Sequence, residues 1–270
     1  MSPFDGCRQR LGRAKFHRDA LSDMWREFAT KEGAYTVRLR VNDDGTGSIW
    51  MFQVEDGGLF NTFALQFGEM LYQIRAALDG IVYQAAILET GQNPPPDEHN
   101  LEFPICGTAA EFAKKAPLYL RPLAQKRRDI IESVQPYKIP DLAPEDVVFN
   151  FNRALGILND WAKKDRHRRI HVAGSWVSNA SPKIRCPPGV SLAYLHVTGS
   201  GLLKNESKIA SFRLIGYDPS MNIATNPDLA IDVAVDEIPP PCADNDTLGN
   251  RGLAMLKAAR WLVDTIEESF

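Results

Sequence analysis

The stretch FNTFALQFGEMLYQIRAALDGIVYQAAIL, residues 60–88, sets the architecture of this chain. Large apolar side chains recur in it at steps of three and four, the spacing of one face of an α-helix. That face comprises Phe60, Phe63, Phe67, Met70, Ile74, Leu78, Ile81, Ala85 and Leu88. A stripe about eight turns long predicts a central helix on which the rest of the fold packs. The prolines at 94–96 end this helix, because proline cannot continue one.

Outward from this helix, helical and strand patterns are segregated along the chain rather than alternating. A helical pattern from Ala14 to about Lys31 comes first, and a hairpin follows whose two strands flank the turn sequence NDDGTG. Segregation of this kind favours α+β over a doubly wound fold. We therefore predict one α+β domain over residues 1–270. It has a helical portion at about 60–168, a mainly antiparallel strand-rich portion at about 169–240 and a C-terminal helix at about 247–270.

Bulk composition excludes several classes of protein. With 44% hydrophobic and 24% charged residues, the chain is typical of soluble proteins. A net charge of −3 gives no general attraction to nucleic acid or anionic lipid, so such binding would need a local basic patch. The four cysteines are far apart, and no apolar run resembles a signal peptide or a membrane span. We expect a cytoplasmic protein with no membrane partner. Motifs for cofactors, phosphate loops or activated nucleophiles are absent, so no cofactor is predicted.

The segment NDWAKKDRHRRIHVAG, residues 159–174, concentrates polar chemistry where a helix gives way to a strand. Asp165 extends the apolar stripe of the preceding helix by three positions, which places a carboxylate in line with the core. A buried carboxylate needs a cation or backbone donors, and Arg75 is one available cation. The alternative is a helix-end salt bridge without a ligand.

The basic residues that follow allow two interpretations. Arg166, Arg168 and Arg169 suit bidentate binding of phosphate or carboxylate. Cations in the last turn of a helix are also stabilised by its dipole without any ligand. His167 and His171 are four apart, but the strand pattern from Ile170 breaks the helical geometry that a shared metal would need. No metal site is predicted.

The central helix carries a polar flank beside its apolar stripe. Arg75, Asp79 and Tyr83 follow one another at steps of four, with Gln84 adjacent. Such a flank is either ordinary polar packing or one wall of a polar pocket.

Two resemblances arise from these strings. IRAALDGIVYQAA, NLEFPI, QPY and DRHRRIH occur in that order between residues 74 and 171. The chain thereby resembles a group of uncharacterised bacterial proteins, common in actinobacteria, with an LDxxVYQ-type helix and a later D-[KR]-H-R element. The resemblance implies functional positions but no reaction. Those positions are Asp79, Tyr83, Gln84, Asp165, His167 and Arg168.

The second resemblance is local. RHRRIH, residues 166–171, is similar to the R-x4-H motif of HEPN domains, helical RNases of toxin and defence systems. It implies a metal-independent RNase in which His171 is the general acid or base and Arg166 stabilises phosphorane charge. In HEPN domains the motif lies on a bundle helix, whereas a strand pattern begins inside it here.

Three hypotheses stand. In the first, an anionic small molecule or partner binds at a junction of Arg75, Asp79, Tyr83 and Gln84 with Asp165, His167 and Arg168. In the second, Arg166 and His171 serve an RNase, and RNA is the partner. In the third, the junction only braces the fold. The sequence leaves enzymatic activity and oligomeric state open.

Overall fold

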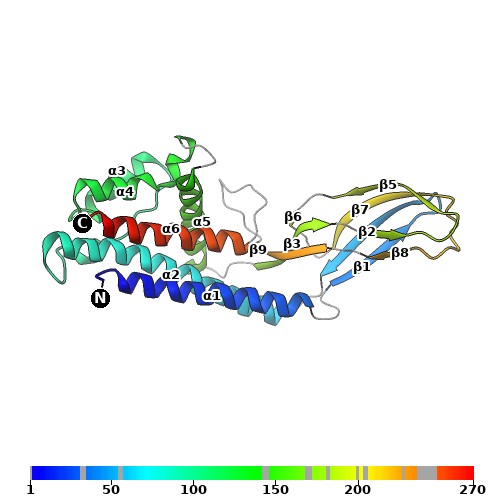
Figure 1. Cartoon of the computed structure of the whole chain (residues 1–270), viewed down its shortest axis with the longest axis horizontal. Coiled ribbons are helices and arrows are strands. Elements are labelled where there is room, and N and C mark those ends of the chain that lie inside the picture. Colours follow the sequence, from blue (N-terminus) through cyan, green and yellow to red (C-terminus); the bar gives the residue numbers. More distant parts are fainter. Residues whose placement is uncertain are drawn as a thin grey trace.

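The computed structural model describes residues 2–30, 35–53, 57–141, 146–167, 172–180, 183–198, 201–202, 206–226, 229–235 and 248–270. The chain forms an elongated α+β molecule in which the helices occupy one end and the strands the other (Figure 1). The predicted fold class is confirmed. The element order is helix, hairpin, helices, strands and helix, as expected from the segregated patterns.

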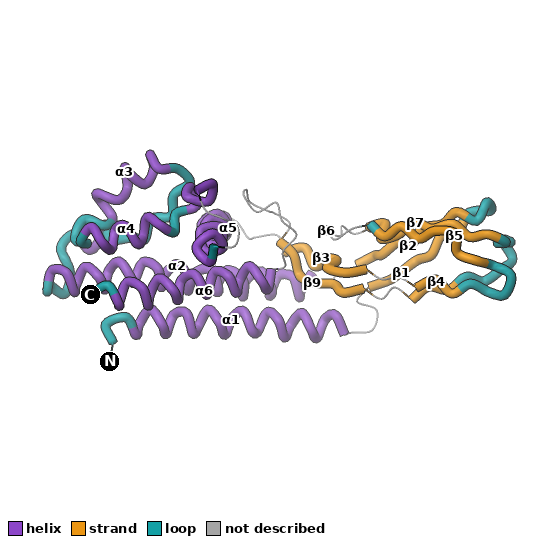
Figure 2. Tube along the Cα trace, turned by 45° about the horizontal axis from the view of Figure 1, so that its top comes forward, coloured by secondary structure: helices purple, strands orange, loops and turns teal. Residues whose placement is uncertain are grey.

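Long helices build the helical end around the predicted central one. α1 and α6 run side by side with α2, and α5 crosses them (Figure 2). Their bounds are α1 Asp5–Thr30, α2 Gly57–Thr90, α5 Val147–His167 and α6 Leu248–Glu268. The C-terminal helix thus packs on helices, including the central one. The first helix begins nine residues before the expected Ala14, and it belongs to the helical end although it precedes the hairpin.

The apolar stripe of α2 is buried where it contacts the other helices. Phe63, Phe67, Met70, Ile74, Leu78, Ile81 and Ala85 are at most 2% exposed. Leu88 does not continue the stripe, because its side chain is 40% exposed. Leu71 and Val82, which lie off the stripe, are also buried. α2 is therefore enclosed on more than the single face that its periodicity predicts.

Short elements connect α2 to α5. These are η1 Glu98–Asn100, α3 Ala109–Tyr119, α4 Gln125–Ser133 and η2 Pro136–Asp141. Thr108 caps α3: the Glu111 N–H donates to Thr108 Oγ1 at 3.1 Å, and Glu111 Oε2 accepts the Gly107 N–H at 3.1 Å. Between η1 and α3 the chain is extended and belongs to no sheet.

A four-stranded antiparallel sheet dominates the other end. Its order is β1-β2-β7-β5, and its strands are β1 Tyr35–Val41, β2 Thr46–Gln53, β7 Glu206–Ile215 and β5 Ser191–Val197. The predicted hairpin joins β1 and β2. Gly45 in its turn has φ +78°, and a Cβ there would lie 2.6 Å from the Leu214 carbonyl oxygen, so the turn requires glycine.

Smaller sheets complete the strand-rich end. β3 lies between β6 and β9, and β4 pairs with β8. Their bounds are β3 Val172–Ala180, β4 Lys183–Arg185, β6 Gly201–Leu202, β8 Ala224–Asn226 and β9 Leu229–Val235. The molecule has two separate hydrophobic clusters among its described residues, one between the helices and one against the four-stranded sheet. In the described part of the chain, no helix is both long enough and apolar enough to cross a membrane.

Gln135 offers a test of how the short elements are held. Its amide is fully buried; Nε2 donates to the Pro104 and Ile131 carbonyl oxygens, and Oε1 accepts the Cys106 N–H at 2.8 Å. We expect Gln135→Ala to lower the free energy of unfolding by about 2–3 kcal/mol, because buried main-chain groups lose their partners. Gln125→Ala, which removes an exposed amide from α4, should change it by no more than about 0.5 kcal/mol. Urea titration measures both, and equal losses would contradict the assigned role.

Candidate functional site

A cavity of about 930 Å³ opens between the helices at the flank of α2 that the sequence singles out. It is bounded by the first turns of α1, the polar flank of α2, the segment from η1 onward, the end of α3 and the last turns of α5. Its lining residues are Gly6, Cys7, Arg10, Gly68, Leu71, Tyr72, Arg75, Ala76, Asp79, Gly80, Tyr83, Gln84, His99, Asn100, Leu101, Glu102, Leu118, Tyr119, Ala162, Asp165 and Arg166.

The cavity brings the two predicted polar groups together. The first group is the α2 flank Arg75, Asp79, Tyr83 and Gln84; the second, from the end of α5, is represented by Asp165 and Arg166. His167 is the last residue of α5, but its side chain lies outside the described part of the structure. Arg168, Arg169 and His171 lie outside the described residues altogether.

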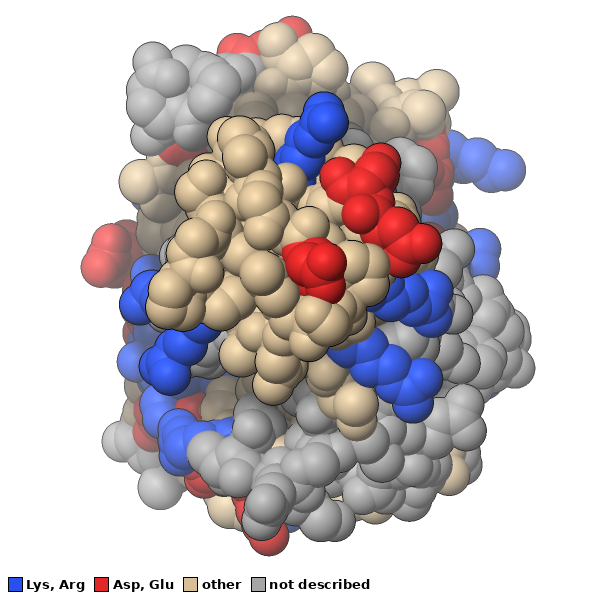
Figure 3. Space-filling view, turned by 90° about the vertical axis from the view of Figure 1, so that its right-hand side faces the viewer, with Lys and Arg blue, Asp and Glu red and all other residues tan. Residues whose placement is uncertain are grey.

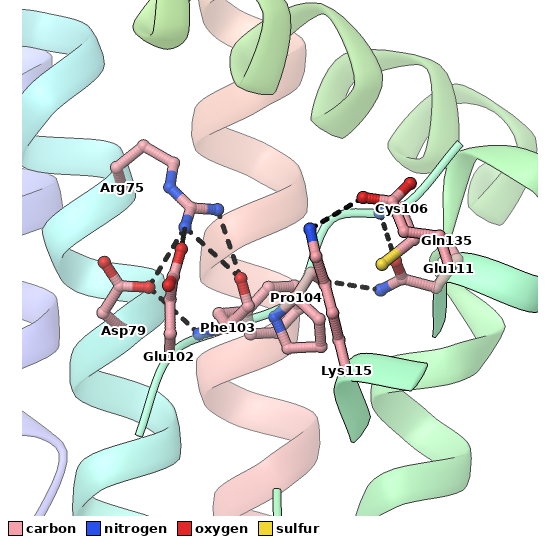
Figure 4. Close-up of polar contacts among 9 residues, drawn as sticks. All are labelled: Arg75, Asp79, Glu102, Phe103, Pro104, Cys106, Glu111, Lys115 and Gln135. Atoms are coloured by element: carbon pink, nitrogen blue, oxygen red, sulfur yellow. Dashed lines mark hydrogen bonds and ion pairs between the residues drawn. The ribbon is translucent and has the colours of Figure 1, made fainter. Parts of the chain in front are cut away.

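Arg75 and Asp79 form a wall that is bonded to the extended segment, as Figure 4 shows. Arg75 is 12% exposed, and its Nη2 donates to Asp79 Oδ1 at 3.2 Å and to Glu102 Oε1 at 3.1 Å. Both Nη atoms also donate to the Phe103 carbonyl oxygen, each at 3.3 Å. Asp79 Oδ1 accepts the Phe103 N–H at 3.0 Å. Arg75, named from the sequence as one available cation for Asp165, instead bonds Asp79, Glu102 and the Phe103 carbonyl oxygen.

The Asp79 carboxyl is the acidic member of this wall. Burial raises its pKa above the usual value, against the opposing effects of the Arg75 guanidinium and the Phe103 N–H. Arg166 also acts on this carboxyl from the end of α5. Its effect on the pKa of Asp79 is smaller than those of burial, Arg75 and the Phe103 N–H.

Asp165 is placed by a close approach of two helices. A Cβ added at Gly68 of α2 would lie 2.5 Å from Asp165 Oδ2 and 2.9 Å from Oδ1. Only glycine lets the carboxylate rest against α2 at this distance. Burial, reinforced by the nearby charge of Glu69, raises the pKa of the Asp165 carboxyl. No side chain within the described ranges forms a hydrogen bond or an ion pair with it.

Two guanidiniums at the cavity have no partner carboxylate among the described residues. Arg10 comes from α1 and Arg166 from α5, and both are exposed. Neither forms an ion pair or a hydrogen bond with any residue that the structure describes. This sets them apart from Arg75, whose donors are directed at the protein itself.

The remaining lining is aromatic and apolar. Tyr72 is 60% exposed, and the Tyr83 hydroxyl donates to Glu98 Oε2 at 3.1 Å. Leu118 and Tyr119 from α3 face the cavity. Cys7 also lines it, but burial raises the pKa of its thiol to about 11, so the thiol stays protonated near neutral pH and is a poor nucleophile. A ligand here would meet cationic groups beside an apolar and aromatic surface.

Sequence reasoning missed the contributions of α1 and α3. Arg10 precedes the point where the first helix was expected to begin, and no local motif marks it. Leu118 and Tyr119 end a helix whose sequence gives no sign of where it packs. Across the described ranges, no cluster of three or more His, Cys, Asp or Glu side chains is placed to hold a metal ion.

Comparisons with models of protein families, with curated proteins and with solved structures give no match to this chain. Kinship with the bacterial group resembled above stays a prediction. The sequence motifs on which this resemblance rests nevertheless lie close together in space. Asp79 forms a hydrogen bond with the main chain of Phe103, and Gln135 forms hydrogen bonds with the main chain of Pro104 and Cys106 (Figure 4). The start of the fourth string, at Asp165, lines the same cavity as Asp79.

The contact between Gly68 and Asp165 can be tested by a double-mutant cycle. Replacing glycine by alanine inside a helix raises the free energy of unfolding by about 0.5–1 kcal/mol. Gly68→Ala should not give this gain in stability, because the new Cβ collides with the Asp165 carboxylate. Gly12→Ala on α1, where a Cβ meets nothing within 4 Å, should give that gain. In a protein that already carries Asp165→Ala, the carboxylate is absent, so Gly68→Ala should give the full gain in stability. Thermal or urea unfolding gives the four stabilities, and additive effects would contradict the contact.

The raised pKa of Asp165 predicts a pH-dependent gain for Asp165→Asn. A raised pKa means that the folded state favours the neutral carboxyl. At pH 7 the ionised carboxylate therefore destabilises the folded wild type, and the Asp165→Asn variant should have the higher free energy of unfolding. As the pH falls through the folded pKa towards the unfolded value of about 3.9, the wild type protonates and the difference should vanish. Asp43→Asn, in the exposed hairpin turn, is the control. A stability loss at pH 7 with Asp165→Asn would show that the charged form is needed.

Proposed function

We propose that the chain binds a small molecule carrying an anionic group in the cavity beside α2. The observation that supports this most is the pair Arg10 and Arg166. They reach one cavity from helices far apart in sequence, and no described carboxylate pairs with either. Guanidiniums in this state bind carboxylate or phosphate by charge-assisted, bidentate hydrogen bonds.

The rest of the lining indicates what else the ligand carries. Tyr72, Leu101, Leu118 and Tyr119 provide apolar and aromatic surface beside the cations. Small-molecule sites combine such surface with a few polar groups that fix orientation. An aromatic or aliphatic body with one anionic end suits this arrangement.

The acidic side chains in the cavity do not prevent anion binding. Asp79 is engaged by Arg75 and by the Phe103 N–H, so its charge is compensated locally. Burial raises the pKa of both Asp79 and Asp165, which favours their neutral forms more than at an exposed site. Binding of an anion next to either carboxyl should accordingly favour its protonation further.

A bracing role is the second candidate, and a specific observation favours it for part of the junction. The described hydrogen bonds of Arg75 and Asp79 join these two side chains to each other and hold the extended segment against α2. On this alternative no ligand binds, and the cavity is a by-product of helix packing. Arg10 and Arg166 distinguish the two candidates, because neither makes such a contact with the described residues.

The RNase alternative stays a prediction. Arg166 lies in the last turn of α5, which ends at His167 as described, and β3 begins at Val172. His171, the residue that would act as acid or base, falls outside the described residues. No described contact favours this candidate over the first.

Calorimetric titration of the full chain with phenyl phosphate and with benzoate tests the proposal. We expect both to bind the wild type and the double variant Arg10→Gln/Arg166→Gln to bind at least about tenfold more weakly, because charge-assisted hydrogen bonds are lost. The matched control is Arg13→Gln/Lys163→Gln, which removes two exposed cations from the same two helices outside the cavity. The control should bind like the wild type.

Two outcomes would contradict the proposal. If neither anion binds the wild type, bracing is the role that the contacts support. If the two double variants weaken binding equally, the effect is that of net charge and not of the cavity.

A further inference from the structure

The outward face of the four-stranded sheet has a composition of its own. In an antiparallel pair, directly opposed residues lie on the same face. The register pairs Arg38 with Trp50 and Trp50 with Lys208, across β1, β2 and β7. It pairs Arg213 of β7 with Tyr194 of β5. Four basic or aromatic positions on three strands, and Tyr194 on the fourth, therefore share one face.

The complete face follows from the same register. Its polar and aromatic members with described side chains are Thr36, Arg38, Arg40, Thr46, Ser48, Trp50, Ser191, Tyr194, His196, Lys208, Ser211 and Arg213, and the exposed Ile215 of β7 lies on the same face. We call this set the basic sheet face. None of its described side chains is acidic. By register Glu206 falls opposite Phe52 at the end nearest the helices, and Asp44 lies in the turn at the other end, where its Oδ1 accepts from Thr46.

This face is open, whereas the opposite face of the sheet is covered. Arg38, Arg40, Lys208, Arg213, Tyr194 and His196 are exposed. On the other side Ile49, Phe212 and Leu214 are buried and pack with residues of β4 and of the loops around it. The sheet thus presents these exposed cations and the Tyr194 ring outward.

Seen from the strand-rich end, charge is distributed unevenly. Lys and Arg side chains gather along the flanks, and the acidic side chains on the near side sit at the tip (Figure 3). The chain has a net charge of −3, so a cationic sheet face is a local feature and not a property of the whole.

Its aromatic groups are arranged for stacking. The Arg40 guanidinium carbon lies 5.1 Å from the centroid of the Trp50 ring, and Trp50 Nε1 donates to Ser48 Oγ at 2.8 Å. The indole is therefore held in place on the sheet. Tyr194, on the edge strand β5, is 49% exposed. Ring faces and guanidinium planes are the surfaces on which unpaired bases stack.

We propose that the basic sheet face binds single-stranded nucleic acid. Its cations neutralise phosphates while Trp50 and Tyr194 stack bases, a combination that duplex DNA cannot use because its bases are already stacked. At about 3.3 Å per residue and 4.8 Å between strands, the face extends about 16 Å along β7 and 14 Å across the sheet. That area accommodates a few nucleotides. An anionic membrane would be attracted by the same cations but would not need the rings.

Fluorescence anisotropy with labelled oligonucleotides tests this on the full chain. The probes are oligo-dT and oligo-U of about 15 nucleotides and a DNA duplex of the same length. We expect both single strands to bind at low salt and more tightly than the duplex. A wild type that binds neither single strand, or that binds the duplex as well as them, would overturn the proposal.

Charge variants separate this face from general electrostatics. Lys208→Gln/Arg213→Gln removes two exposed cations from β7 and should weaken binding about tenfold or more. The slope of log K against log salt should become shallower by about 1.4, because about 0.7 is contributed per phosphate contact. Lys183→Gln/Arg185→Gln removes the same two residue types from β4, on the covered side, and should leave binding unchanged. Equal losses in the two double variants would overturn the assignment.

A ring variant tests stacking separately. Tyr194→Ala should weaken single-strand binding about tenfold without altering the salt slope, and Tyr194→Phe should restore it. Circular dichroism confirms that each variant folds. Binding to phosphatidylserine vesicles that is lost with Lys208→Gln/Arg213→Gln but kept with Tyr194→Ala, together with no single-strand binding, would show that the face serves a membrane instead.

Discussion

The arrangement of the helices depends on one short extended segment, whose main-chain N–H and carbonyl groups need hydrogen-bond partners. Residues 101–106 leave η1 and enter α3 without joining any sheet, so their N–H and carbonyl groups need other partners. Asp79 and Arg75 serve Phe103 from α2, and Gln135 serves Pro104 and Cys106 from the start of η2. Because these side chains come from both directions, the segment fixes α3 and α4 against α2. The cavity is the space that this attachment leaves beside the polar flank of α2.

Charge in the cavity is governed by which groups already have partners. The N–H groups of Arg75 donate to Asp79 and Glu102. Arg10 and Arg166 form no such bond with the described residues. Asp165 is held against α2 by shape, through Gly68, and not by a described ion pair. The charged groups of the cavity therefore divide into those that bond to the extended segment and those that form no bond with the described residues.

The features that could be predicted from the sequence were those that depend on residues close together in the chain. The stripe of α2, the capping box at Thr108, the Asp-Gly hairpin and the segregation of helices from strands follow from spacing and turn chemistry within a few residues. The meeting of Asp79 with Asp165 was predicted only in outline, from two stripes expected to pack together. The acceptors that bind Arg75 were not predicted, because Glu102 and Phe103 approach through a segment whose position no periodicity specifies. Arg10 was missed for the same reason.

The basic sheet face shows this limit most clearly. Its cations occupy positions 38, 40, 208 and 213, and in linear order each stands among ordinary alternating strand residues. The basic and aromatic residues that stand close together in sequence, such as those at the end of α5, are not the ones that form this face. The face exists only once β2 lies beside β7, so long-range strand order carries the information that local composition lacks.

That strand order also constrains synthesis of the protein. Ile49 of β2 pairs with Ala210 of β7, 161 positions later in the chain. At about 5–20 residues per second, a ribosome needs roughly 8–30 s to deliver the partner strand. During that interval the newly made hairpin has an edge of β2 without its neighbour, which is the condition under which strands of different chains pair. Arg38 and Arg40 lie on β1, which covers the opposite edge of β2, so the hairpin carries both charges, and mutual repulsion of such charges disfavours pairing between nascent copies.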